Sequence, residues 1–146
     1  LNKDEKIIYS LHGDGELQEG QIWEAAMYAS AKNVDNLICT IDLNGQQIDG
    51  STDEVMNMGS LETKFKAFGF DVLVEKDGND MAKVLAALAE AKLRTGKGKP
   101  VCILLHTEMG NGVDFMMGSH KWHGVAPNDQ ELANALSQNE ETLGDY

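Results

Sequence analysis

The sequence predicts an α/β fold in which helices flank a parallel sheet. An apolar run at residues 6–11 is typical of a buried strand. A helical pattern follows, with small or apolar side chains at Ile22, Ala25, Ala26 and Ala29, and a second apolar run spans residues 37–41. A strand, a helix and a second strand in this order favour two parallel strands joined by a crossover helix.

Two further apolar runs extend the predicted sheet to four strands. They lie at residues 69–74 and 101–105, and the second is fully apolar, so we expect it to be buried on both faces of the sheet. Ser60 is placed to cap a short helix with Leu61, Phe65 and Phe68 on one face. These segments fit helices packed against a parallel sheet.

Two more helices are expected in the second half of the chain. Residues 81–91 give the clearest helical pattern, and their predicted core-facing side chains are Met81, Val84, Leu85, Leu88 and Ala91. Asn128 with Glu131 resembles a capping box that opens a last helix, on which we expect Leu132, Ala135 and Leu136 to face inward. The acidic tail after residue 138 is expected to be frayed.

Composition restricts the class of partner. The 146 residues suffice for one domain with a sizeable core, and the net charge of −12 disfavours nucleic acid and anionic membranes as partners. No apolar run approaches the roughly 20 residues of a membrane span, and no signal peptide is visible, so a cytoplasmic location is expected. Cys39 and Cys102 lie in apolar runs, which favours reduced core thiols.

The predicted functional centre is the turn Gly13-Asp14-Gly15 together with Asn44. Asp14 and Asn44 follow the first two strands, at the edge where open α/β sheets bind ligands. A glycine turn before a helix offers N–H groups to an anion, but Glu16 and Glu19 would repel a bare phosphate. A divalent cation removes the conflict, and Asp14, the Asn44 oxygen and a backbone carbonyl are ligands that suit Mg²⁺. The residues predict a magnesium–diphosphate site; the alternative is an ordinary turn rich in glycine and aspartate.

The same residues carry a resemblance to a known family. Gly13-Asp14-Gly15, a spacer and Asn44 resemble the thiamine diphosphate signature, GDG followed by N. The longer strings GDGELQEGQIWEAA and IDLNGQQIDG narrow the resemblance to the transketolase family, and most closely to the N-terminal subunit of split transketolases. It extends along nearly the whole chain, to KWHGVAPND at residues 121–129. The resemblance implies a thiamine diphosphate-binding fold and, as cofactors, thiamine diphosphate with Mg²⁺ (or Ca²⁺ or Mn²⁺).

The resemblance also implies roles for the matching residues. The implied metal ligands are Asp14, Asn44 and the backbone carbonyl of Gln46. The implied cofactor-binding residues are Gly13, Asp14, Gly15, Asn44, Gln46, Ile48 and His123. His123 matches the family histidine that contacts the diphosphate and the substrate side of the cofactor, and Glu19 matches a glutamate that links the two cofactor sites of the dimer. These two are the implied catalytic residues.

The implied reaction is that of a transketolase of the pentose phosphate pathway, a transferase that moves a two-carbon ketol unit from a ketose phosphate to an aldose phosphate. The family's diphosphate-binding domain has a further half before the GDG strand, so residues 1–146 are expected to be its C-terminal half and to need that upstream half. The glutamate that activates the cofactor lies in the pyrimidine-binding C-terminal subunit. We therefore expect a homo- or hetero-oligomer, and no activity from this chain alone.

Two alternatives stay open at this point. One is a related thiamine diphosphate enzyme that acts on another substrate, because the shared motifs do not read the sugar. The other is a non-catalytic module that serves only in assembly.

Overall fold

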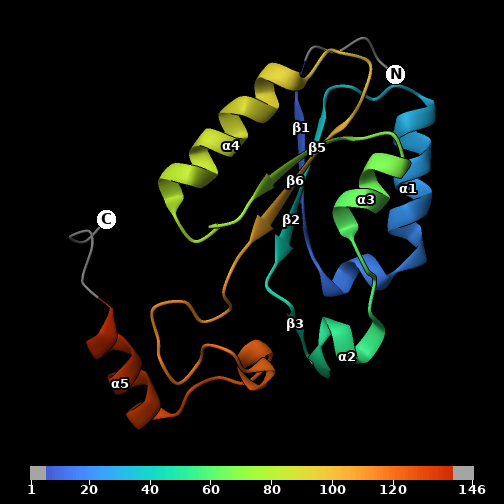
Figure 1. Cartoon of the computed structure of the whole chain (residues 1–146). Helices are drawn as coiled ribbons and strands as arrows, with labels where there is room; N and C mark the ends of the chain where they lie inside the picture. The colour runs from blue at the N-terminus through green and yellow to red at the C-terminus, as the bar shows by residue number, and fades with distance from the viewer. Residues whose placement is uncertain (1–5, 140–146) are drawn as a thin grey trace.

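The computed structural model describes residues 6–139, and its centre is a four-stranded parallel sheet (Figure 1). The strands are β1 (Ile8–Gly13), β2 (Leu37–Leu43), β5 (Asp71–Glu75) and β6 (Val101–His106). They stand in the order β1-β2-β6-β5, and each adjacent pair is parallel. The four predicted strands and their parallel pairing are confirmed. A small antiparallel pair, β3 (Gln46–Gln47) and β4 (Gly50–Ser51), follows β2.

Helices cover both faces of the sheet. The helices of the described residues are η1 (Gly15–Gln18), α1 (Gly20–Ala31), α2 (Thr52–Met56), α3 (Leu61–Ala67), α4 (Met81–Arg94), η2 (His120–His123) and α5 (Asp129–Gln138), where η denotes a 3₁₀ helix. The predicted Ser60 cap of α3 is confirmed, because its side chain accepts a hydrogen bond from the Thr63 N–H. The predicted capping box of Asn128 and Glu131 at α5 is also confirmed.

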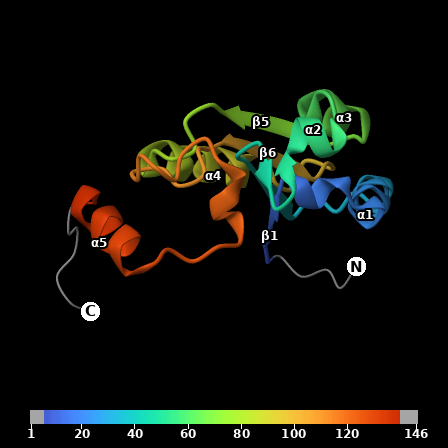
Figure 2. The same ribbon diagram turned by 90° about the horizontal axis from the view of Figure 1, so that it is seen from below.

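The core has two parts, one on each face of the sheet. Successive side chains of a strand point to opposite faces. Cys39, Ile41 and Leu104 therefore pack with Phe65 of α3 and small residues of α1, whereas Ile38, Val101 and Ile103 pack under α4. Figure 2 shows α4 on a different side of the sheet from α1 and α3. Strand β6 is covered on both faces, as its apolar run predicts.

Several predicted core positions are exposed. Met81 and Leu85 lie on the solvent side of α4, because Val84, Leu88 and Ala91 are the residues that pack against the sheet. The prediction that they face the core was therefore wrong. Ala25 of α1 is exposed as well.

Helix α5 also differs from expectation, because Leu132 and Leu136 are exposed and Ala135 alone of the three is buried. The helix stands apart from the sheet (Figure 1) and is held by the loop after β6. The Gln138 side chain donates a hydrogen bond to the Asp114 carboxylate and accepts one from its N–H, both 2.8 Å long.

The first strand differs most from expectation. It was predicted to be buried, yet Ile8, Tyr9 and Leu11 are all exposed, because β1 is an edge strand that pairs with β2 alone.

Within residues 6–139, no helix is long and apolar enough to cross a membrane. The tail expected to be frayed lies, after residue 139, outside the described residues.

Candidate cofactor and metal site

The ends of β1 and β2 bring the two halves of the predicted site together. Gly13 lies opposite Asp42 in the parallel register, and the Asp14 N–H donates to the Asp42 carbonyl at 3.0 Å. Beyond these ends lies a cavity of about 350 Å³. Its lining residues are Gly13, Asp14, Gly15, Glu16, Asn44, Gln46, Gln47, Ile48, Asp49 and His123. Every residue predicted to bind the cofactor lines this one cavity.

Asp14 is a buried carboxylate at the centre of the site. It is 3% exposed, and its two oxygens accept hydrogen bonds from the Gly45 N–H at 2.6 Å and the Gly15 N–H at 2.8 Å. Burial raises the pKa of Asp14 above its usual value; the two amide hydrogen bonds oppose this shift, and the charge of Asp42 adds to it. A cation beside Asp14 would offset the cost of its buried charge.

Asn44 and Gln46 are fixed by local hydrogen bonds. The Asn44 side-chain oxygen accepts from the Gln46 N–H at 2.9 Å, and its amide nitrogen donates to Asp42 at 3.3 Å. Asp42 also accepts a hydrogen bond from the Thr107 hydroxyl, which ties the end of β2 to the segment after β6. The Asn44 oxygen is thereby held at the cavity on a short, bonded segment.

The glycine turn does not present free amides to an anion. The Gly13 N–H donates to the Glu16 carboxylate at 3.3 Å, and the Gly15 N–H is bonded to Asp14. His12 contacts the same glutamate through Nδ1 at 3.2 Å. The segment that follows is a 3₁₀ helix, and α1 begins only at Gly20. The prediction that glycine amides of the turn are open to an anion was therefore wrong at both positions.

Gln47 lines the cavity and was not singled out from the sequence. Its side-chain oxygen is buried and has no hydrogen-bond partner among the described residues. It lies beside Gly15, where an added Cβ would come within 3.1 Å of the Gln47 Cβ. Such an orphaned oxygen requires a partner, and a cation or a water bound to a cation would supply one.

His123 reaches the cavity from a distant part of the chain. It ends η2, which is anchored by the Trp122 side chain through a hydrogen bond to the Phe115 carbonyl at 3.0 Å and an edge-to-face ring contact. Ile48 lines the same cavity and also a neighbouring one of about 560 Å³, beside Lys121 and Trp122. The two cavities therefore share Ile48 as a lining residue.

Glu19 is the one predicted site residue that does not line the cavity. It stands immediately before α1 with its side chain exposed, and it makes no side-chain cap. Its assignment to a dimer interface stays a prediction.

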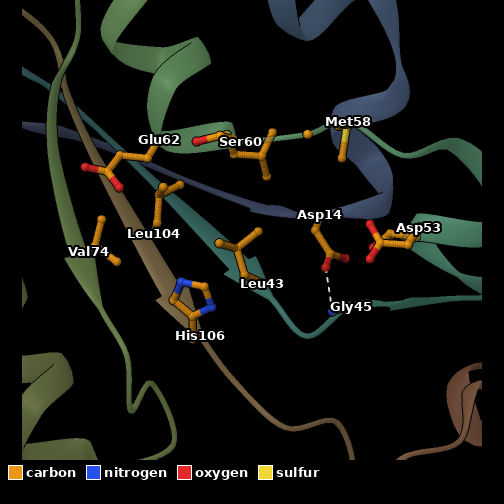
Figure 3. Close-up of a pocket in the computed structure, with 13 residues that line it drawn as sticks. Asp14, Leu43, Gly45, Asp53, Met58, Ser60, Glu62, Val74, Leu104 and His106 are labelled. Atoms are coloured by element: carbon orange, nitrogen blue, oxygen red, sulfur yellow. Dashed lines mark hydrogen bonds between the residues drawn. The ribbon is translucent and has the colours of Figure 1, made fainter.

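A further cavity of about 360 Å³ lies on the other side of Asp14 (Figure 3). Figure 3 shows Asp14 bonded to Gly45 at one end, near Asp53, with Glu62 and His106 further along. Its lining carries three carboxylates, those of Asp14, Asp53 and Glu62, and neither glycine of the Gly13-Asp14-Gly15 turn. This cavity lacks Asn44, Gln46 and Gln47, whose amide groups line the first cavity beside Asp14.

The donor set determines which cation suits the site. Residues 6–139 contain no group of three histidine, cysteine, aspartate or glutamate side chains that could hold a metal ion. A cation at Asp14 would therefore have at most two such side chains as ligands, beside amide and carbonyl oxygens, and would need further oxygens from its ligand. This is the usual manner in which proteins bind Mg²⁺ with a phosphate.

Comparison with known proteins decides the family. Residues 2–141 match the model described as transketolase, thiamine diphosphate binding domain. This chain belongs to the transketolase family. Its fold is accordingly the α/β thiamine diphosphate-binding fold of transketolases. Transketolase from Leishmania mexicana superposes with a TM-score of 0.82 at 34% identity, over 90% of this chain and 19% of that chain. Transketolase from Campylobacter jejuni superposes with a TM-score of 0.82 at 34% identity, over 92% of this chain and 20% of that chain.

Curated relatives include subunits of transketolases. The chain is 38% identical over 143 residues to one subunit of the apulose-4-phosphate transketolase of Phocaeicola vulgatus, and the match covers 98% of this chain and 50% of the relative. It is 40% identical over 131 residues to a 6-deoxy-6-sulfo-D-fructose transketolase subunit of a Clostridium species, and this match covers 90% of this chain and 46% of the relative. The chain therefore spans about half the length of these transketolase subunits.

Proposed function

We propose that this chain is the part of a transketolase that binds Mg²⁺ and the diphosphate of thiamine diphosphate. The observation that carries the proposal is the buried Asp14 carboxylate, which joins the ends of β1 and β2 beside the oxygens of Asn44 and Gln47. Asp14, Asn44 and the Gln46 carbonyl would hold the cation, which would in turn hold the diphosphate. Mg²⁺ fits this donor set best, and Ca²⁺ or Mn²⁺ would occupy the same oxygens.

Other residues of the cavity have roles that follow from their chemistry. His123 carries a proton donor or acceptor at the mouth of the cavity, where it would face the diphosphate and the substrate side. Ile48 offers an exposed apolar surface on which the cofactor ring can pack. When bound, thiamine diphosphate supplies the carbanion chemistry of the reaction, and the protein supplies binding and proton handling.

The proposed reaction needs other polypeptides. It is the transfer of a two-carbon ketol unit from a ketose phosphate to an aldose phosphate. We propose that residues 1–146 form the C-terminal half of the diphosphate-binding domain, and that the upstream half and a pyrimidine-binding subunit complete the enzyme. Glu19 would lie at the contact between cofactor sites. On this proposal the chain alone is inactive.

The sugar is a separate question. The two related subunits are named for different sugars, apulose 4-phosphate and 6-deoxy-6-sulfo-D-fructose. A related thiamine diphosphate enzyme with another acidic sugar as substrate is therefore the second candidate, and a panel of phosphorylated and sulfonated ketoses on the complete enzyme distinguishes the two.

The first experiment is calorimetric titration of thiamine diphosphate with and without Mg²⁺. It is run on the chain alone and on its mixture with the upstream half and the pyrimidine-binding subunit. Binding only with Mg²⁺ and only in the mixture supports the proposal. The Asp14→Asn chain in the same mixture is expected to lose that binding. If no mixture binds the cofactor, the assignment of Asp14, Asn44 and His123 to a working site is wrong.

A further inference from the structure

The two cysteines of the chain lie side by side on adjacent strands of the sheet. Cys39 of β2 and Cys102 of β6 are partners in the parallel register, and both are free thiols. Register partners on adjacent parallel strands point to the same face, and both side chains belong to the core cluster that also contains Phe65. The fold therefore pairs two thiols that are far apart in the sequence.

The spacing of β2 and β6 suits a disulfide. Neighbouring strands of a sheet lie about 4.8 Å apart, and the Cα atoms of disulfide-bonded cysteines are usually about 4.4–6.8 Å apart. Cys39 and Cys102 can therefore bond without a change of strand register. A metal suits them less well, because structural zinc sites use four ligands. Residues 6–139 contain no group of three histidine, cysteine, aspartate or glutamate side chains that could hold a metal ion.

The two thiols have different surroundings. On the side away from Cys102, the register partner of Cys39 is Ser10 of β1, and His12 follows Ser10 on the same face. On the side away from Cys39, the partner of Cys102 is the apolar Val72 of β5. Cys102 is fully buried, whereas Cys39 is 6% exposed. Polar groups therefore gather on the Cys39 side of the pair.

These surroundings favour a thiolate at Cys39. A hydrogen bond with the Cys102 thiol lowers the pKa of Cys39 to about 7; burial opposes this shift, and the Ser10 hydroxyl and His12 add to it, while Glu16 opposes it. The same hydrogen bond and burial raise the pKa of Cys102, which stays protonated. Because the thiolate is the nucleophilic form of cysteine, Cys39 is the reactive member of the pair.

We propose that Cys39 and Cys102 form a redox pair that a hydroperoxide oxidises to a reversible disulfide. With hydrogen peroxide, the Cys39 sulfur bonds to one oxygen, the O–O bond breaks, and hydroxide leaves and takes up the proton that Cys39 had released. Cys39 is then a sulfenic acid. The Cys102 sulfur attacks the Cys39 sulfur, the S–O bond breaks, and the hydroxyl group leaves with the Cys102 proton as water. The two thiols supply two electrons, and the peroxide becomes two water molecules.

The pair is separate from the cofactor cavity, although it lies on strands that carry the site. Neither cysteine lines that cavity. Asp42, further along β2 from Cys39, accepts a hydrogen bond from the hydroxyl of Thr107, which follows β6. A disulfide would join the same two strands covalently. Its formation does not depend on the proposed function and is measured without cofactor or sugar.

The test is treatment of the folded chain with hydrogen peroxide, followed by intact mass and peptide mapping. We expect a chain lighter by two hydrogen atoms, in which the peptides of Cys39 and Cys102 are joined. Dithiothreitol is expected to restore both thiols. Since both sulfurs belong to one chain, the rate should not depend on protein concentration.

Two matched variants separate the roles of the two thiols. In Cys102→Ser, Cys39 is expected to stop at the sulfenic acid, which dimedone labels. In Cys39→Ser, Cys102 is expected to react with peroxide at least tenfold more slowly. Circular dichroism checks the fold of each variant. Brief alkylation of the unchanged chain with iodoacetamide gives the same comparison without a substitution, and Cys39 is expected to carry at least tenfold more label.

Urea distinguishes the folded pair from chance collision in the unfolded chain. At urea concentrations that leave the chain folded, the oxidation rate is expected to stay within twofold of its value in buffer, whereas a reaction through unfolding would accelerate with the unfolded population. Three results overturn the inference: no disulfide in the peroxide-treated folded chain, equal reactivity of Cys39 and Cys102, or an oxidation rate that rises in proportion to the unfolded fraction.

Discussion

The Asp14 carboxylate, which follows β1, accepts a hydrogen bond of 2.6 Å from the backbone N–H of Gly45, which follows β2. Gly45 has a φ of +73°, a conformation that glycine adopts without strain. This bond joins the two strand ends that carry the candidate metal ligands. Asp14 therefore has a structural role in the chain alone and a proposed metal role in the assembled enzyme.

Replacing Asp14 by asparagine tests both roles. In the assembled enzyme we expect Mg²⁺-dependent thiamine diphosphate binding to weaken by more than about 100-fold, because loss of an outer-sphere partner alone costs up to about that factor. In the chain alone we expect unfolding free energy to fall by about 1–3 kcal/mol, because an amide NH₂ cannot accept the second N–H bond. Calorimetry and urea unfolding measure the two effects.

The matched control for this change is Asp53→Asn. Asp53 is an exposed carboxylate in the neighbouring cavity and outside the proposed cofactor cavity. We expect its replacement to change stability by no more than about 0.5 kcal/mol and to leave cofactor binding intact. Equal loss of binding in both variants would mean that overall acidity, rather than the position of Asp14, governs the cation.

The raised pKa of Asp14 predicts a specific pH dependence in the absence of divalent cations. Burial raises the folded-state pKa above the usual value of 3.8, so between these two values the folded chain binds more protons than the unfolded chain. The contribution of Asp14 to stability therefore falls as pH rises from the unfolded pKa through the folded pKa, and it is constant above that.

Urea unfolding in EDTA over a pH series measures this effect. The stability difference between the unchanged chain and Asp14→Asn is expected to shift against the unchanged chain as pH rises through this window. A difference that stays constant, or that shifts in favour of the unchanged chain, contradicts the assignment of a raised pKa to Asp14.

Gln47 gives a prediction of opposite sign for stability and for binding. Its orphaned side-chain oxygen imposes a desolvation cost of about 1–3 kcal/mol, which an apolar side chain of similar shape avoids. We expect Gln47→Met to stabilise the chain alone by about 1 kcal/mol in urea unfolding, and to weaken Mg²⁺-dependent cofactor binding in the assembled enzyme. Gln46→Met is the control, since its proposed ligand is a backbone carbonyl. A destabilised Gln47→Met chain would show that the oxygen already has a partner.

The sequence predicts the site better than it predicts the surface. Asp14 and Asn44 could be placed together because parallel strands end at one edge, which needs only the order of strand, helix and strand. Gln47 could not be identified, because its buried and unpartnered oxygen lies beside Gly15, a contact between segments remote in sequence. The exposed state of Leu11 was also missed, since an apolar run does not distinguish an edge strand from an inner one. The prediction that Met81 faces the core was wrong for a related reason. The helical period shows which side of a helix is apolar, but not how many of the apolar side chains on that side are buried.

The aromatic cluster under α1 should dominate the stability of the chain. Phe65 is 1% exposed, and its ring centre lies 5.4 Å from that of Trp23 and 5.3 Å from that of Phe70. Phe65→Ala is expected to lower the unfolding free energy by about 3–5 kcal/mol, because it removes buried contacts and leaves a cavity. The control Met27→Ala, on the exposed side of α1, should cost no more than about 0.5 kcal/mol. If denaturant unfolding gave similar costs for the two variants, Phe65 would not lie in a close-packed core, and the packing of α3 against β5 would be wrong.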